Sequence, residues 1–173
     1  ASQLLTGNDN TVFGYNAYLS QAPGHENHKA GGHNTFIGSN SGDGAYATTT
    51  AVENMTALGS GTLSGALTGA ANGAVAVGSY SLNALSSGAG NTAVGFFAGT
   101  AITSGAKNVA IGFEALKSLT TGDNNIAIGY QALLDGNTSE TDNIAIGAHA
   151  LQNMDDGNST KNIAIGTSVM LGV

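Results

Sequence analysis

The sequence predicts an all-β fold, a β-solenoid of about nine coils, from three observations. A pentapeptide with the pattern Asn-x-Ala-Ile/Val-Gly recurs along the chain of 173 residues. Its period settles at about 17 residues, which is too short for a helical-hairpin repeat and suits one coil of a solenoid. Each period also contains a second short apolar segment, so that two strand-sized pieces alternate with turns.

The clearest copies of the pentapeptide lie in the second half of the chain. They are 91–95, 108–112, 125–129, 143–147 and 162–166, and weaker copies end at Gly14, Gly38, Gly59 and Gly78. The spacing of the closing glycines shortens from Gly14 to Gly78, is constant from Gly78 to Gly129, and lengthens slightly from there to Gly166. We therefore expect one solenoid domain over 1–173, with irregular, loop-bearing coils in 1–73 and regular 17–19-residue coils in 74–173.

The second apolar segment follows each closing glycine at a fixed distance. Its copies are Ala115-Leu116, Ala132-Leu133, Ala150-Leu151 and, less perfectly, Ser81-Leu82. Turn-forming residues separate the two segments, for example Thr120-Thr121-Gly122-Asp123, and their Gly and Asn residues tolerate a positive φ. We expect a second strand here in each coil, with the chain reversing at these turns.

Alternation within the pentapeptide places bulky residues on one face of each strand and small residues on the other. We predict that the bulky face fills the interior of the coil, with the core formed by Val109, Ile111, Ile126, Ile128, Ile144, Ile146, Ile163 and Ile165. We predict that the small face lines a close contact between chains, through Ala76, Ala93, Ala110, Ala127, Ala145 and Ala164. So thin a coil encloses little apolar volume, and self-association is expected.

Composition excludes several classes of partner. The chain has four Lys, no Arg and 11 acidic residues, for a net charge of −7, so the positive charge that binds nucleic acid or an anionic membrane is missing. No apolar run approaches the roughly 20 residues that span a bilayer, so we expect no membrane insertion by this segment. The chain has no Cys, which excludes disulfides and thiol chemistry.

The sequence does not point to an enzyme or to a cofactor. Its many Ser and Thr residues lack a nucleophile-elbow context, and its Gly-rich stretches have no following Lys to hold a phosphate. The Asp and Gly turns lack the nonapeptide of calcium-binding β-rolls. Ice binding is an alternative function for a flat solenoid, but clusters such as Thr48-Thr49-Thr50 do not fill one column coil after coil.

The candidate binding residues lie in an insertion between the first two coils and in the one that follows. Histidines 25, 28 and 33 fall within nine positions, and Tyr46 lies in the second insertion. Loops vary in shape without disturbing the coils, so His25, His28, His33 and Tyr46 are the predicted receptor-binding residues. The three histidines are also weak candidates for a metal site, although no Cys accompanies them.

Aromatic residues follow the closing glycines and admit two interpretations. They are Tyr15, Phe96, Phe113 and Tyr130, with Tyr80 and Phe97 one position later. Stacked at solenoid spacing, they could form a ladder for sugar rings, or they could cover the corner of the coil and pack on the leucines. Because Phe has no polar group, packing is favoured.

The segment Asn125-Ile126-Ala127-Ile128-Gly129-Tyr130-Gln131-Ala132-Leu133 resembles the head repeat of YadA-like trimeric autotransporter adhesins. It is also similar to repeats of phage tail fibres. The resemblance covers 74–166 well and 10–59 more loosely, and the coils are longer here than in the compact adhesin repeat. It implies a left-handed parallel β-roll, an intertwined homotrimer and a role in attachment.

We therefore expect a structural or adhesive module of a trimeric extracellular fibre, on a bacterial surface or a virion tail. Its expected partners are its own copies and a cell-surface receptor, a glycan or a protein. Low charge and the absence of Arg favour a neutral glycan. The alternative is a fibre spacer without a ligand of its own. The sequence leaves open the receptor, the bacterial or phage origin, and any segments for export and anchoring.

Overall fold

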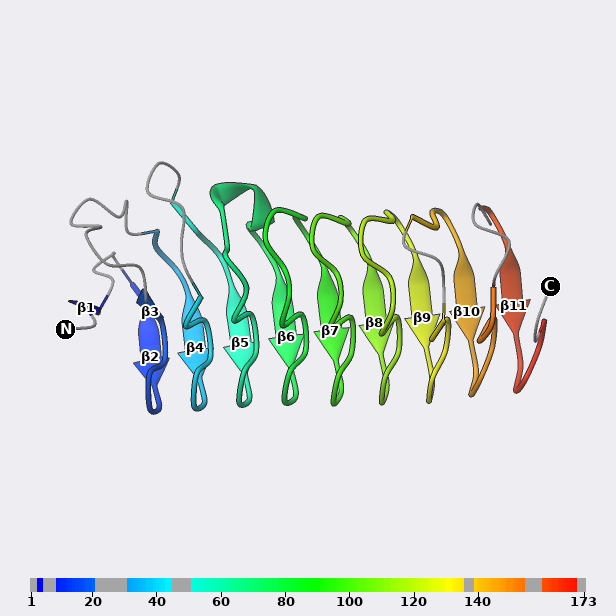
Figure 1. The fold of residues 1–173 in the computed structure, drawn as a ribbon, viewed down its shortest axis with the longest axis horizontal. Helices are drawn as coiled ribbons and strands as arrows, with labels where there is room; N and C mark the ends of the chain where they lie inside the picture. Colours follow the sequence, from blue (N-terminus) through cyan, green and yellow to red (C-terminus); the bar gives the residue numbers. More distant parts are fainter. Residues whose placement is uncertain are drawn as a thin grey trace.

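The computed structural model of the chain describes residues 3–4, 9–20, 31–44, 51–135, 139–154 and 160–170. The protein is all-β, and nine short strands stack in sequence order into one parallel sheet of a β-solenoid (Figure 1). These strands are β2 (Thr11–Phe13), β4 (Thr35–Ile37), β5 (Thr56–Leu58), β6 (Val75–Val77), β7 (Thr92–Val94), β8 (Val109–Ile111), β9 (Ile126–Ile128), β10 (Ile144–Ile146) and β11 (Ile163–Ile165). Each predicted pentapeptide therefore supplies one strand.

A two-stranded sheet and a short helix accompany the parallel sheet. β1 (Gln3–Leu4) and β3 (Leu19–Ser20) pair antiparallel beside the first coil. A short 3₁₀ helix, η1 (Gly69–Ala71), lies in the loop between β5 and β6, and the Thr68 hydroxyl caps it by accepting a hydrogen bond from Ala70 N at 3.3 Å. Neither element interrupts the stacking of the coils.

A ladder of buried asparagines keeps the strands in register. Equivalent residues pair throughout, for example Ala110 with Ala127. The Asn125 Oδ1 accepts hydrogen bonds from the backbone N of Asn143 at 3.1 Å and from its Nδ2 at 3.2 Å. The Asn125 Nδ2 donates to Asn108 Oδ1 at 3.0 Å and to the Glu140 carbonyl at 2.8 Å. A slip of one residue would leave these buried polar groups unsatisfied, so the ladder specifies the register.

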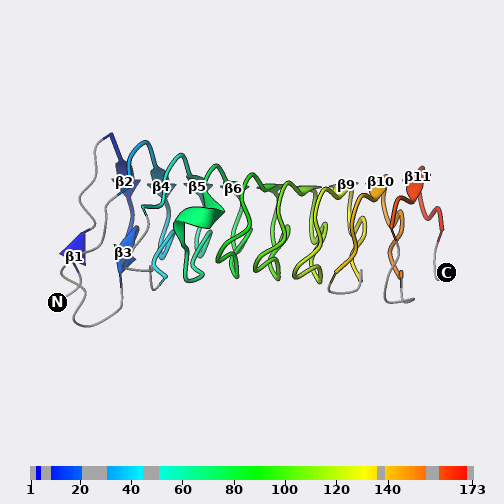
Figure 2. The same cartoon turned by 90° about the horizontal axis from the view of Figure 1, so that it is seen from above.

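The second apolar segment of each coil forms a leg of turns, where a second strand had been predicted. Leu116 and Leu133 adopt left-handed backbone conformations with φ of 51° and 50°, which end any extended run. The legs are still hydrogen-bonded from coil to coil, as when Leu116 N donates to Ala132 O at 3.1 Å. Figure 2 shows the sheet along one side of the solenoid and these legs along the other.

The interior of the regular coils is built from alanine and leucine. Ala127 in β9 and Leu133 in the following leg are both fully buried, as are their equivalents in neighbouring coils. Sheet and leg lie so close together that a leucine from the leg fills the space and leaves room for only a methyl group from the strand. The alanines predicted to form a contact between chains are instead enclosed within each coil: Ala76, Ala93, Ala110, Ala127, Ala145 and Ala164.

The prediction for the bulky strand residues was wrong in the same way. They were expected in the core, but they point outward and are half-buried or exposed: Val109, Ile111, Ile126, Ile128, Ile144, Ile146, Ile163 and Ile165. Alternation along a strand separates two faces and does not say which one lies inside. The leucines of the second segment decide the question, because they already occupy the interior.

The first coils have a larger interior than the regular ones. Phe36 takes the strand position that alanine holds in the later coils, and Tyr18 packs against it from the leg. Their rings stack with centroids 4.5 Å apart and planes 11° apart, and both side chains are buried. This aromatic pair supplies the apolar volume that Ala and Leu supply elsewhere.

The closing glycines allow the coils to approach each other closely. Gly129 has a φ of 138°, and a Cβ atom there would lie 2.5 Å from the carbonyl oxygen of Gly147 in the next coil. Neither the backbone conformation nor the space tolerates a side chain at this position. The glycine of the pentapeptide is therefore a requirement of the stacking.

Candidate functional site: the outer face of the sheet

The largest candidate interaction surface is the outer face of the parallel sheet, formed by the first and third residues of each strand. The first column consists of Thr11, Thr35, Thr56, Val75, Thr92, Val109, Ile126, Ile144 and Ile163. The third column consists of Phe13, Ile37, Leu58, Val77, Val94, Ile111, Ile128, Ile146 and Ile165. We call these two columns the outer face.

The outer face is long, flat and largely apolar. Nine strands at about 4.8 Å spacing extend it over about 38 Å. Ile111 keeps 37% of its surface exposed in the middle of the sheet, and Ile165 keeps 67% at its end. The third column is apolar along this whole length, and an exposed apolar column of this extent is typical of a surface that another molecule covers.

The polarity of the outer face changes along the solenoid. Threonine fills the first column in four of its first five strands, and Val or Ile fills it from β8 onward. Sequence reasoning overlooked this threonine column, although the second residue of each pentapeptide copy would have revealed it. Val75 interrupts the threonine column, and Thr92 is its last residue. The wholly apolar part of the outer face therefore lies over the later coils.

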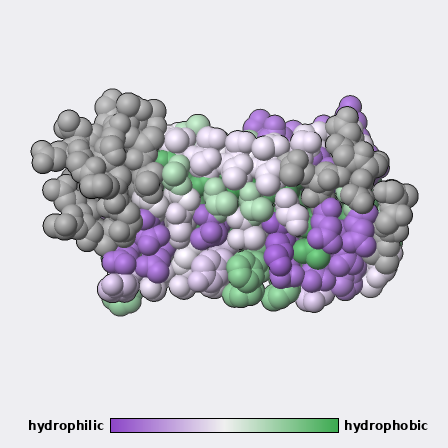
Figure 3. All heavy atoms as spheres, in the orientation of Figure 1, coloured by the Kyte–Doolittle hydropathy of each residue, from purple (hydrophilic) through white to green (hydrophobic). Residues whose placement is uncertain are grey.

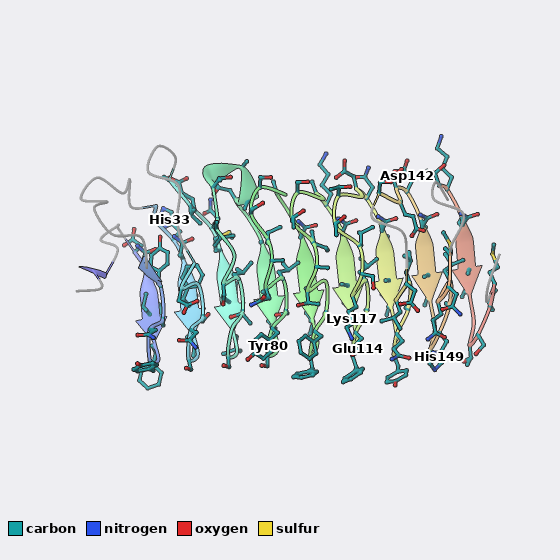
Figure 4. All side chains as sticks on the ribbon, viewed as in Figure 1. His33, Tyr80, Glu114, Lys117, Asp142 and His149 are labelled. Carbon is teal, nitrogen blue, oxygen red and sulfur yellow. The ribbon has the colours of Figure 1, made fainter. Side chains whose placement is uncertain are left out.

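The rim where the strands begin, the upper rim in Figure 1, is polar. Its residues precede the first residue of each pentapeptide copy, have φ between 58° and 78°, and are exposed. They are Asp9, His33, Asn54, Gly73, Gly90, Lys107, Asn124, Asp142 and Lys161. Gly, Asn and Asp tolerate the left-handed region best, which explains much of this composition. Figure 4 shows His33 and Asp142 on this side of the molecule.

The rim where the strands end, the lower rim, carries most of the predicted aromatic residues. We call its continuous part the aromatic strip: Tyr80, Phe96, Phe97, Phe113, Tyr130 and His149. Figure 3 shows hydrophobic atoms gathered along this rim in the middle of the solenoid. Phe113 and Tyr130 remain 40% and 48% exposed. The rings of the strip contact one another along the coils of β6 to β10, and much of their surface is left uncovered.

A small charged network adjoins the aromatic strip. Lys117 Nζ donates to Glu114 Oε1 at 2.7 Å, and Gln131 Nε2 donates to Glu114 Oε2 at 2.8 Å. These two hydrogen bonds hold the pKa of the Glu114 carboxyl below its usual value. Lys117 also lies 5.7 Å from the centroid of the Phe97 ring, within the range of a cation–π contact.

The predicted receptor residues are mostly outside the described residues. His25, His28 and Tyr46 fall there, and of the four only His33 can be placed. His33 is exposed on the upper rim, and its Nδ1 lies 3.7 Å from Asp9 Oδ2. Within the described ranges, no three His, Cys, Asp or Glu side chains are grouped to hold a metal ion.

The buried tyrosine of the first coil is electrostatically distinct. Burial raises the pKa of Tyr18 to about 12, and the hydrogen bond from Asn34 Nδ2 to its phenol oxygen, at 3.4 Å, opposes part of that shift. The phenol is therefore held neutral inside the coil. Its position makes it a structural group of the N-terminal core.

Comparison with known proteins gives no relative for this chain: no family model, no curated protein and no solved structure matches it. In the part of the chain that the structure describes, no helix has the length and apolar character needed to cross a membrane.

Proposed function

We propose that this chain is a structural and adhesive module of a trimeric extracellular fibre. The observation that carries the proposal is the outer face, which extends over about 38 Å of an otherwise thin solenoid and is apolar throughout its third column. Three copies that turn these faces toward a common axis would bury them together. The number three, the left-handed winding and the intertwining of the chains come from the resemblance of the pentapeptide to YadA-like heads and phage tail fibres.

The outer face suits self-association better than a small ligand. It is flat and repeats the same side chains, whereas small-molecule sites are concave and combine apolar walls with a few placed polar groups. A symmetric assembly uses the same patch on every copy, and a face of repeated apolar side chains can pack against the same face of another copy. Association of copies would also give the thin coils the apolar burial that one chain lacks.

The assembly is tested with one charge placed on the outer face. Ile128→Lys places an ammonium group in the buried centre of the proposed trimer, which should abolish assembly while each chain keeps its fold. The matched control is Asn124→Lys in the same coil, because Lys107 and Lys161 already occupy that upper-rim position in other coils. Light scattering should give three times 17.0 kDa for the wild type and the control, and the mass of one chain for Ile128→Lys. A monomeric wild type would overturn the proposal.

Attachment is proposed to involve the N-terminal third, on an extracellular surface of a bacterium or a virion. The two longest repeats, from Gly14 to Gly38 and from Gly38 to Gly59, lie there and carry the insertions with the predicted receptor residues. Deleting residues 22–32 should abolish binding of the trimer to whole cells or to a panel of neutral glycans and leave its mass unchanged. If binding persists, the receptor site lies elsewhere, and if the intact trimer binds neither cells nor glycans, the module is a spacer.

A further inference from the structure

The aromatic strip is a second apolar surface that the proposed packing of outer faces does not by itself explain. Phe96, Phe113 and Tyr130 lie on successive coils and are each 40–48% exposed. Such large side chains are seldom left uncovered in a row, because each would bury a large apolar area against a partner. The question is what covers them.

The stacking of the rings argues against a sugar as the occupant. The Phe96 and Phe113 centroids are 5.7 Å apart with planes 21° apart, and those of Phe113 and Tyr130 are 5.4 Å apart with planes 10° apart. The ring faces are therefore turned toward one another, and mainly the ring edges point to solvent. A sugar ring stacks on a free aromatic face, which the middle of this strip does not offer.

The strip is continuous with the outer face. Only the closing glycine separates Ile111 from Phe113 and Ile128 from Tyr130. The strip spans the coils of β6 to β10 and so overlaps the wholly apolar part of the outer face, which begins at β8. In the coils of β4, β5 and β6 the corresponding rim position is serine, at Ser39, Ser60 and Ser79, and in the first coil it is the exposed Tyr15. One apolar surface thus wraps from the sheet around the lower rim of the later coils.

We propose, on the basis of the trimer proposed above, that the aromatic strip of each chain packs on the outer face of the neighbouring chain at the same level. A rotation axis parallel to the solenoid relates copies without shifting them along it. Each strip then meets the aliphatic part of the neighbour's outer face. An antiparallel pair would instead bring the strip toward the threonine-bearing coils. The upper rim, with exposed Lys107, Asn124 and Asp142, offers no such apolar match.

The test replaces the strip with the residue that the chain itself uses at the same position in earlier coils. The triple variant Phe96→Ser, Phe113→Ser and Tyr130→Ser should raise the concentration at which the trimer dissociates by at least about tenfold, since buried interface aromatics contribute strongly to affinity. The matched control is Lys107→Ser, Asn124→Ser and Asp142→Ser on the upper rim, for which dissociation should change by less than about threefold. Sedimentation equilibrium measures both variants, and circular dichroism checks that each chain remains folded.

A photo-crosslinking residue at position 130 gives a readout that does not depend on the stability of the triple variant. It should join two chains through a peptide that contains β8, β9 or β10 of the neighbour. The inference would be overturned by crosslinks to the neighbour's upper rim, or by a trimer that gives no crosslink between chains. Neither result would contradict the trimer itself. The inference also fails if the triple variant dissociates at the same concentration as the wild type but no longer binds glycans. A wild type that is monomeric would overturn the trimer and the inference together.

Discussion

The N-terminal coils and the regular coils use one backbone plan with opposite distributions of bulk. Around β4, the interior holds Phe36 and Tyr18, the first outer column is threonine and the rim is serine. Around β9, the interior holds Ala127 and Leu133, the outer face is isoleucine and the rim is aromatic. From β4 to β9 the aromatic groups thus move from the inside of the coil to its outside, although the first coil also exposes Phe13 and Tyr15. The early coil keeps its aromatic groups in the core, whereas the later coil leaves them partly exposed on its surface.

The largest effect is expected from removing the aromatic core of the early coils. Phe36→Ala should lower the free energy of unfolding by about 3–5 kcal/mol, because it leaves a cavity and removes the ring that stacks on Tyr18. Denaturant unfolding measures the loss. Phe13→Ala is the control, since Phe13 is 75% exposed on the outer face of the neighbouring strand. A larger loss for Phe13→Ala would contradict the contrast between the two regions.

A large residue at the middle strand position, which Phe36 holds in β4, should destabilise the regular coils. Ala127→Leu should destabilise each chain by about 1–3 kcal/mol, because Leu133 and its neighbours already fill the interior. Since Ala127 lies inside its own coil, this loss should not depend on protein concentration. Ala148→Leu is the control at a rim position that Tyr130 occupies in the preceding coil. A loss for Ala127→Leu that grows on dilution would instead place the alanine between chains.

Sequence reasoning predicted the position of every strand of the parallel sheet but inverted its faces. The period and the closing glycines follow from local backbone requirements, such as the positive φ of Gly129, and these are readable in one chain. The direction in which Ala127 and Ile128 point depends on the distance between sheet and leg, which is a tertiary quantity. A count of the leucines in the second segment would have given the correct answer, because they leave no volume for isoleucine.

The candidate surfaces were predictable only in part. Aromatic residues after the closing glycines were identified, but the alanine column predicted to face other chains lies inside each coil. The exposed fraction of Ile111 or Tyr130 depends on packing between coils that sequence spacing does not reveal. The left-handed backbone at Leu116 and Leu133 was also missed, because leucine seldom adopts it.

The next largest effect is expected from the asparagine ladder of the regular coils. It runs without a break from Asn91 to Asn162. Met55 and Ala74 take its position in the coils of β5 and β6, whereas in the first two coils Asn34 N donates to Asn10 Oδ1 at 3.0 Å. Asn125→Ala should cost about 1–3 kcal/mol, because buried partners in both adjacent coils lose their hydrogen bonds. Asn124→Gly is the control, since glycine holds that upper-rim position in two other coils. Equal losses for the two variants would show that the ladder adds little.

Alkaline pH should weaken the early coils selectively through Tyr18. Its pKa in the folded chain, about 12, lies above the value of 10.0 in the unfolded chain. The stabilisation is therefore complete below pH 10 and is lost as the pH rises through about 12, because the unfolded chain gives up the proton first. Thermal unfolding across this range should fall more steeply for the wild type than for Tyr18→Phe. Identical pH profiles would show that the phenol is not buried in its neutral form.

The smallest effect is expected at the rim of the regular coils, where Glu114 is held by Lys117 and Gln131. Its pKa is lowered in the folded chain, so its contribution to stability is present above the ordinary pKa of glutamate and is lost as the pH falls through the lowered value. Surface pairs of this kind contribute little, and the difference in melting temperature between the wild type and Glu114→Gln should be slight and should disappear in acid. A carbon-detected NMR titration is the more sensitive measurement, because Lys117→Met removes the first hydrogen-bond donor and should raise the pKa of the Glu114 carboxyl. An unchanged pKa in Lys117→Met would mean that Gln131 alone holds the carboxylate, and that the charged network does not order the rim beside the aromatic strip.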